Sequence, residues 1–357
     1  MRLKQIALRL PTPPSAENPA HVLVTDGIYK RGKQLIDQLS ASGFTVDIQG
    51  AMDGDALCAY LQAHPVAAIL LKAQSKLTRA ALEAAPQLCF VGRVGVGKDN
   101  LDLAAARDLG IRVMYTPGVN ADAVAEAAFW HMLNLSRRFP SASDLLRSHV
   151  YSATALDQGV NLVTVKDFFA NEQGLYGKRL GLYGFGNIAQ AIARRAQIFG
   201  MSVYWHSRRA QTIGTCELGC RVASLEELLR MSDIFSINVD LTPETKKQIN
   251  AERLKLLPDG ALVINTARGL IVDPPAILAE LRAGRLKYGT DVFFNEPQLS
   301  GDDLELISLP AERVSLTPHN GGGTVDANDR GIGLVVKALT EYFFERRDIE
   351  AKYQALP

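Results

Sequence analysis

Residues Gly177–Arg209, GKRLGLYGFGNIAQAIARRAQIFGMSVYWHSRR, decide the fold of this chain. The apolar run Leu180–Tyr183 suits a buried strand, and Gly184–Ala189 follows at once in the pattern G-x-G-x-x-A. Apolar residues then recur at helical spacing until Gly200, and Met201–Trp205 begins a second apolar run. The stretch therefore predicts a strand, a glycine turn, a helix and a second strand.

This glycine turn is typical of a site that binds the pyrophosphate of a dinucleotide. Gly184 permits the tight turn, Gly186 lets the backbone approach the phosphates, and Ala189 lets the helix pack on its strand. The helix N-terminus adds free N–H groups and a partial positive charge. We expect Gly184, Gly186, Asn187 and Ile188 to bind the cofactor. The alternative is a tight turn in an unrelated α/β domain.

The end of the second strand bears on which dinucleotide is bound. An Asp or Glu usually lies there, about 20 residues after the glycines, when the cofactor has a free 2′-hydroxyl. This chain has instead His206, Ser207, Arg208 and Arg209. A guanidinium can bind a 2′-phosphate through two hydrogen bonds, whereas a carboxylate would repel it. The sequence favours NADP(H) at Ser207, Arg208 and Arg209. NAD(H) stays possible if the arginines are only solvated surface charges.

Size and composition indicate an ordinary globular protein. A chain of 357 residues suits two domains, and its 47% apolar and 22% charged residues are unexceptional. The formal net charge of +1 gives no electrostatic case for nucleic acid or an anionic membrane. No signal-peptide core or bilayer-spanning stretch is evident, so we expect a cytoplasmic enzyme. The four cysteines suggest neither disulfides nor a zinc site, so we expect no metal.

Strand and helix patterns alternate along both halves of the chain. Residues 21–119 alternate short apolar runs with short helical patterns, which predicts a parallel sheet with helices on both faces. An alanine-rich pattern over 120–138 predicts a long helix that is apolar on more than one side and could bridge two domains. Periodicity is weak over 141–176. The alternation resumes at Gly177 and ends in a long helical pattern over 325–345.

Polar segments follow three of the predicted strands in the second half: Asn265–Gly269, Asp291–Pro297 and Thr317–Gly323. Open α/β sheets bind ligands at the carboxyl ends of their strands. Together the segments supply a guanidinium, a carboxylate and an imidazole. Hydride transfer to a 2-keto acid uses all three. The arginine anchors the carboxylate and polarises the keto oxygen, the histidine gives or takes a proton, and the acid fixes the histidine tautomer.

From about residue 65 to 345, the chain resembles the D-isomer-specific 2-hydroxyacid dehydrogenase family. The resemblance rests on motifs that stand in the family's order: Gly92–Asp102, Val124–Glu126, the glycine turn, Thr266–Gly269, Asp291–Pro297 and Thr317–Gly322. It implies a homodimer of α/β subunits. Each would have two doubly wound parallel-sheet domains, a Rossmann cofactor domain and a flavodoxin-like substrate domain, with a cleft between them.

We expect the substrate domain to be discontinuous, with residues 1–117 and 322–357, and the cofactor domain to span 118–321. The terminal helix would then pack on the substrate domain.

The resemblance also assigns roles in the second half of the chain. Arg268 matches the substrate-binding arginine, Glu296 the acid that pairs with the catalytic histidine, and His319 that histidine. Asp291 matches an aspartate that contacts the nicotinamide carboxamide. Thr266 and Gly322 lie in the matching segments, and we expect them at the cofactor as well.

Three substrate contacts are expected in the first half. Val94 and Gly95 lie in the loop whose backbone N–H groups hold the substrate carboxylate in the family. Lys72 lies where relatives that bind phosphorylated substrates carry an arginine, so it is expected to face the substrate. The other five histidines have no comparable context, and we expect them to be structural: His21, His64, His131, His149 and His206.

Several departures from the family pattern narrow the function. Asn238–Thr242 stands where the family often has a His-x-Pro-Leu-Thr run near the cofactor, so the resemblance does not assign cofactor contacts to this loop. Residues 138–176 are longer than usual, as in an oligomer arm or an altered rim of the active site. Formate-oxidising relatives carry Gln in place of Glu296, and phosphite-oxidising relatives carry Lys near Val96, which argues against both substrates.

The sequence therefore predicts an NAD(P)H-dependent enzyme that interconverts a small 2-keto acid and its D-2-hydroxy acid, with glyoxylate or hydroxypyruvate as the expected substrate. A D-3-phosphoglycerate or D-lactate dehydrogenase is the alternative among enzymes. A non-catalytic NADP(H)-sensing, corepressor-like protein is the alternative from another class. The joint presence of Arg268, Glu296 and His319 argues against it, because a sensor needs no proton donor.

Overall fold

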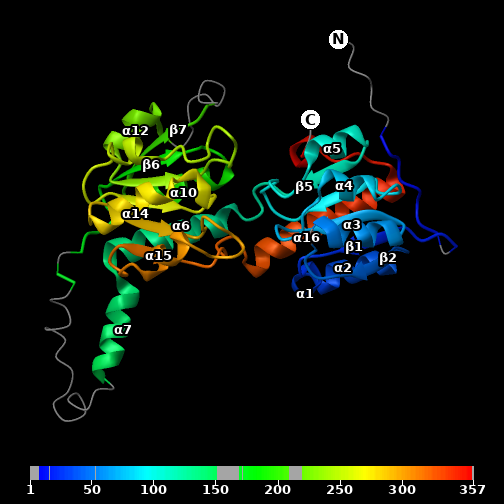
Figure 1. The fold of residues 1–357 in the computed structure, drawn as a ribbon, viewed down its shortest axis with the longest axis horizontal. Helices are drawn as coiled ribbons and strands as arrows, with labels where there is room; N and C mark the ends of the chain where they lie inside the picture. The colour runs from blue at the N-terminus through cyan, green and yellow to red at the C-terminus, as the bar shows by residue number, and fades with distance from the viewer. Residues whose placement is uncertain are drawn as a thin grey trace. The chain divides into compact units, whose positions relative to one another are not determined.

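The computed structural model describes residues 8–15, 17–52, 54–150, 169–170, 172–208 and 219–355. The chain forms two compact units (Figure 1). The first unit is Met1–Asn120 with Gly323–Pro357, and the second unit is Ala121–Gly322. Each unit is built on one parallel sheet with helices packed against it. The expected α/β class with two parallel sheets is confirmed.

The sheet of the first unit has five strands in the order β2-β1-β3-β4-β5. Its strands are β1 (His21–Val24), β2 (Thr45–Ile48), β3 (Val66–Leu71), β4 (Phe90–Arg93) and β5 (Arg112–Tyr115). Its first helices are α1 (Ile28–Arg31), α2 (Lys33–Ala41), α3 (Gly54–Ala63), α4 (Arg79–Glu83) and α5 (Leu103–Asp108). The sequence pattern does not predict the short helix α1.

The terminal helix α16 (Val325–Thr340) packs against α2 and β4 of the first unit (Figure 1). Two glycines allow this close packing. A Cβ on Gly32 would lie 2.6 Å from Ile332 Cδ1, and a Cβ on Gly92 would overlap Val335 Cγ1. The helix ends earlier than expected, at Thr340, and continues as a π-helical turn, η2 (Glu341–Glu345). A last short helix, η3 (Ala351–Tyr353), follows.

The sheet of the second unit has seven strands in the order β12-β11-β10-β9-β6-β7-β8. The strands are β6 (Arg179–Tyr183), β7 (Ser202–His206), β8 (Arg221–Val222), β9 (Ile234–Ile237), β10 (Leu262–Asn265), β11 (Lys287–Thr290) and β12 (Val314–Leu316). Strand β6 pairs with β7 on one side and with β9 on the other. The strand order reverses there, and such a switch point is where open α/β sheets bind ligands.

The helices of the second unit include the two that the sequence predicts most clearly, α6 (Ala121–Arg137) and α10 (Asn187–Ile198). The two pack against each other, and α6 also contacts β10, β11 and β12. The other helices among the described residues of this unit are α7 (Phe139–Val150), α12 (Leu225–Met231), α13 (Ala251–Leu254), η1 (Gly269–Ile271), α14 (Pro274–Arg282) and α15 (Asp302–Ser308). Helix α7, which leads away from the sheet of this unit (Figure 1), is not predicted by the weak periodicity of its segment.

Two smaller features have a clear description. Ser224 and Glu227 form a capping box at the start of α12. Cys58, Cys89 and Cys220 are free thiols, and Cys216 lies outside the described residues. Among the described residues, no helix has both the length and the apolar character that crossing a membrane requires.

The contact between Gly92 and α16 yields a stability prediction. Gly92→Ala should lower the thermal midpoint of unfolding, because overpacking a filled site costs about 1–3 kcal/mol. Gly50→Ala is the matched control, since a Cβ there would meet no atom within 4 Å. In the double variant Gly92→Ala/Val335→Ala, the loss of unfolding free energy should be smaller than the sum of the losses in the two single variants. Strictly additive losses would contradict the proposed contact.

Candidate active site

His319 and Glu296 form a close pair in the second unit. The Nδ1 atom of His319 lies 2.6 Å from Oε2 of Glu296. The other carboxylate oxygen, Oε1, accepts a hydrogen bond from the backbone N–H of Phe293 at 2.9 Å. With Nδ1 held by a carboxylate, Nε2 is the ring atom available to exchange a proton with a substrate. His319 also has a φ of +54°, a strained conformation for a residue with a side chain.

Asp291 anchors the loop that carries His319. Its Oδ1 accepts hydrogen bonds from the Thr317 hydroxyl at 2.6 Å and the Asn320 N–H at 3.0 Å, and its Oδ2 accepts one from the Gly321 N–H at 2.9 Å. Burial raises the pKa of Asp291, and these three donors oppose that effect by stabilising its ionised form. Gly321 packs closely against Asp291 and Ala127. A Cβ on Gly321 would lie 2.8 Å from both Asp291 Oδ2 and Ala127 Cβ.

Arg268 lies in a tight turn after β10. The side chain of Asn265 shapes this turn, since its Oδ1 accepts from the Ala267 N–H at 3.1 Å and its Nδ2 donates to the Arg268 carbonyl at 3.0 Å. A Cβ on Gly269 would overlap the carbonyl of Phe293. The turn is therefore pressed against the backbone that leads to Glu296. The structure thus brings together the segments that carry Arg268, Glu296 and His319.

The glycine turn has the geometry that a dinucleotide needs. Gly184 has a φ of +96°, and a Cβ there would lie 2.5 Å from the carbonyl oxygen of Asn238. Gly186 is the N-cap of α10 and offers no side-chain cap, so the first N–H groups of the helix, from Asn187 and Ile188 onward, remain for a ligand. A Cβ on Gly186 would meet no atom within 4 Å, which leaves space for phosphate.

Two buried polar atoms lack partners at the carboxyl ends of the neighbouring strands. Thr266 follows β10 and Asn238 follows β9, and neither Thr266 Oγ1 nor Asn238 Oδ1 has a hydrogen-bond partner among the described residues. The amide of Asn238 is oriented by its own Nδ2, which donates to the Ser236 carbonyl at 2.9 Å. Unpaired buried polar atoms are costly. Both atoms therefore fit a cofactor that brings hydrogen-bonding groups to this edge of the sheet.

The end of β7 carries Ser207 and Arg208, while Arg209 lies outside the described residues. Burial raises the pKa of Tyr183, the residue before Gly184, and the charges of Arg253 and Arg208 oppose that rise. Gly322, the last predicted cofactor residue, ends the second unit.

Lys72, Val94 and Gly95 lie in the first unit, just past the carboxyl ends of β3 and β4. The backbone N–H of Val94 donates to the Leu71 carbonyl at 2.9 Å, and that of Gly95 donates to the Thr116 hydroxyl at 2.7 Å. Both N–H groups are already engaged, which corrects the expectation that they hold a substrate carboxylate.

The next two N–H groups of the same loop are not engaged in this way. Those of Val96 and Gly97 have no acceptor within the part of the chain that the structure describes. The sequence alone does not identify these two donors, although the repeated Gly-Val pattern of the loop marks the segment.

Lys72 is a half-buried cation in polar surroundings. Its Nζ donates to Asn328 Oδ1 at 2.6 Å, and its backbone N–H donates to Asp26 Oδ2 at 2.7 Å. Burial, together with the nearby cations Arg31 and Arg93, lowers the pKa of Lys72 to about 8. An anion would relieve this repulsion between like charges.

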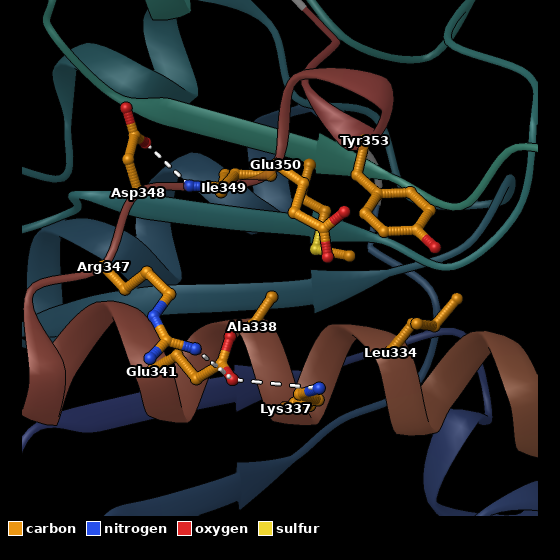
Figure 2. A pocket seen from close by; sticks show the side chains of 10 residues that line it. Leu334, Lys337, Ala338, Glu341, Arg347, Asp348, Ile349, Glu350 and Tyr353 are labelled. Atoms are coloured by element: carbon orange, nitrogen blue, oxygen red, sulfur yellow. Dashed lines mark hydrogen bonds and ion pairs between the residues drawn. The ribbon is translucent and has the colours of Figure 1, made fainter.

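A separate hollow in the first unit is lined by α16 and the tail that follows it (Figure 2). Its cations Lys337 and Arg347 both pair with Glu341, at 3.9 and 3.1 Å. None of the predicted site residues lines it. We do not assign this hollow to the active site.

Comparison with known proteins decides the family. Residues 129–321 match the profile of the D-isomer specific 2-hydroxyacid dehydrogenase, NAD binding domain. The chain belongs to the D-isomer specific 2-hydroxyacid dehydrogenase family. The resemblance inferred from the ordered motifs is thereby confirmed. The chain is an oxidoreductase acting on CH–OH groups with a nicotinamide cofactor.

Several relatives are similar over most of their length. Glyoxylate reductase of Thermococcus litoralis is 36% identical over 278 residues, which cover 78% of this chain and 80% of that protein. Hydroxypyruvate reductase of Thermotoga maritima is 35% identical over 276 residues, which cover 76% of this chain and 84% of that protein. Among solved structures, a glyoxylate reductase from Paecilomyes thermophila has a TM-score of 0.75 at 26% identity, covering 94% of this chain and 98% of that one.

The glycine turn yields a binding prediction. Gly186→Ala should weaken NADPH binding at least about tenfold, a loss of about 1.4 kcal/mol, because its Cβ would occupy the space next to the start of α10. The thermal midpoint of the free protein should not change, since that space is open. Gly174→Ala is the matched control, because its Cβ also meets nothing within 4 Å. Fluorescence titration with NADPH measures the affinity, and an unchanged Kd in Gly186→Ala would count against this phosphate site.

Proposed function

We propose that this protein reduces glyoxylate to glycolate, or hydroxypyruvate to the D-2-hydroxy acid, with NADPH as the hydride donor. The observation that carries the proposal is the His319–Glu296 pair, which lies in the same unit as the turn of Arg268 and the glycine turn. The identity with glyoxylate and hydroxypyruvate reductases supports the choice of substrate.

In the proposed reaction, the bound cofactor supplies hydride to C2 of the keto acid. Arg268 binds the substrate carboxylate and stabilises the charge that develops on the keto oxygen. His319 Nε2 donates the proton that this oxygen takes up, so that the C=O group becomes CH–OH. Glu296 holds the ring through Nδ1 and keeps Nε2 directed at the substrate.

The first unit contributes substrate contacts in this proposal. The N–H groups of Val96 and Gly97 bind the carboxylate, in place of those of Val94 and Gly95, which shape the loop instead. Lys72 faces the part of the substrate beyond C2. Its partial burial and its cationic neighbours support a role with anionic ligands.

For the cofactor, we propose a preference for NADP(H) over NAD(H), with Ser207, Arg208 and Arg209 at the 2′-phosphate. The absence of an Asp or Glu at the end of β7, where Ser207 and Arg208 stand, supports this preference. Thr266, Asp291 and Gly322 would lie near the nicotinamide half. The unpartnered Thr266 hydroxyl supports this placement.

We also propose a homodimer. Helices α6 and α7 and the residue that follows α10 expose apolar rings in the second unit, Trp130 at 41%, Phe139 at 54% and Phe199 at 41%. Exposed aromatic side chains are typical of protein–protein contacts.

Substrate and cofactor are tested together by initial rates. NADPH oxidation should be fastest with glyoxylate or hydroxypyruvate, slower with pyruvate, and faster than NADH oxidation at equal concentration. Arg208→Ala should raise the KM for NADPH about tenfold and leave the KM for NADH nearly unchanged, because only NADPH carries the 2′-phosphate. Equal effects on both cofactors would show that Arg208 does not bind the 2′-phosphate.

The role of Glu296 is tested with Glu296→Gln. We expect kcat to fall about 100-fold, because a general acid that is poorly oriented loses most of its contribution. The Kd for NADPH should stay within about twofold of the wild type. Glu226→Gln, at an exposed position of α12, is the control and should keep full activity. If Glu296→Gln retained the wild-type kcat, the proton-donor pair would be wrongly assigned.

A further inference from the structure

A group of hydrogen-bonding side chains is buried between α6 and the end of the sheet in the second unit. His131 of α6 is 0% exposed, and Ser315 of β12 is 1% exposed. From the sequence, His131 is expected to be a structural histidine. Gly289 of β11 makes room for it, since a Cβ there would lie 2.8 Å from the Cβ of His131.

Both ring nitrogens of His131 have partners that come from β12 or follow it. Nδ1 lies 2.9 Å from Ser315 Oγ, and Nε2 lies 3.1 Å from Thr317 Oγ1. Asn134, one helical turn further along α6, donates from Nδ2 to Ser315 Oγ at 2.9 Å. Thr317 in turn donates to Asp291 Oδ1 at 2.6 Å. The hydrogen bonds form one continuous chain from Asn134 to Asp291.

The direction of each bond in this chain follows from counting hydrogens. The Thr317 hydroxyl has a single hydrogen, which it gives to the carboxylate of Asp291, so it can only accept from His131. Nε2 of His131 must therefore carry a hydrogen. In the neutral ring Nδ1 is then an acceptor, and it takes the hydrogen of Ser315, whose oxygen accepts from Asn134. All donations run toward Asp291.

We propose that His131 is a positioning residue for the catalytic loop. Held as the Nε2–H tautomer, it orients the Thr317 hydroxyl toward Asp291, and Asp291 fixes the backbone of Asn320 and Gly321 beside His319. His131 touches neither substrate nor cofactor in this account. The effects on activity rest on the proposed function, whereas the tautomer and the loop position do not.

The electrostatic surroundings keep the ring neutral. The pKa of His131 falls to about 4 because the effect of burial outweighs that of a backbone hydrogen bond at Ser315, which raises it. The ring of Trp130 lies edge-on to the ring of His131, with 5.0 Å between the two ring centroids. Among the described residues, no charged side chain contributes to this shift.

Asp291 faces the donors of Thr317, Asn320 and Gly321 and the ring of His319, and all four lower its pKa against the effect of burial. A donor that polarises the Thr317 hydroxyl strengthens its bond to the carboxylate. Loss of the His131 donor should therefore raise the pKa of Asp291. The ionised carboxylate holds the loop. When the pH is lowered, a variant without this donor would therefore lose activity at a higher pH than the wild type.

Two conservative variants separate this role from packing alone. In His131→Gln, the amide nitrogen can take the place of Nε2 and reach Thr317. In His131→Asn, the shorter amide can reach Ser315 but not Thr317. We expect His131→Asn to lower kcat about tenfold, leave the KM for NADPH unchanged, and move the acid limb of the kcat/KM profile up by about half a pH unit or more. His131→Gln should keep the wild-type profile.

Two outcomes of this comparison overturn the proposal. In one, both variants lose thermal stability while the acid limb of the profile stays in place. In the other, His131→Gln and His131→Asn shift the profile equally. Either result would assign His131 to packing alone.

An NMR measurement tests the same inference without any turnover. Long-range ¹H–¹⁵N spectra of histidine-labelled wild-type protein should show His131 as the neutral Nε2–H tautomer, with His131→Gln identifying its signals. The amide signals of Asn320 and Gly321 should shift in His131→Asn and remain in place in His131→Gln. A neutral Nδ1–H tautomer, or unmoved amide signals, would overturn the positioning role. Absence of 2-keto acid reduction in the wild type would instead refute the proposed function and leave this result intact.

Discussion

The carboxylate of Asp291 holds the loop on which the proposed chemistry depends. Its two oxygens accept hydrogen bonds from one side chain and two backbone N–H groups of that loop. His319 stands inside the loop in a left-handed backbone conformation, which is unfavourable unless its neighbours fix it. Glu296 then orients the ring. Asp291 thus sets the place of the imidazole, and Glu296 sets its direction.

Close backbone contacts at glycines complete the arrangement in the second unit. Gly184 approaches Asn238, Gly269 approaches the Phe293 carbonyl, and Gly321 approaches Asp291. Each contact joins segments that follow different strands of the parallel sheet. A side chain at any of the three positions would push two such segments apart. The three glycines therefore allow close backbone contact because they have no Cβ. Two of them, Gly269 and Gly321, lie outside the dinucleotide motif.

Much of this arrangement follows from the sequence, and the remainder depends on distant contacts. The glycine turn, α6, α10 and the polar segments after β10, β11 and β12 are predicted because local patterns encode them. None of the described side chains of α7 is buried, and the sequence pattern does not predict this helix. The N–H groups of Val94 and Gly95 look available in sequence, yet tertiary contacts with Leu71 and Thr116 occupy them. His131 looks structural because its partner Ser315 is 184 positions away.

The central claim is that His319 donates the proton in the reduction. The most direct test is a single turnover of the His319→Ala variant with bound NADPH and saturating glyoxylate, following the loss of NADPH absorbance, with the Kd for NADPH measured on the same sample. The account predicts that NADPH oxidation slows by about 10²–10⁴-fold while the Kd stays within about twofold of the wild type. Oxidation at the wild-type rate would contradict it.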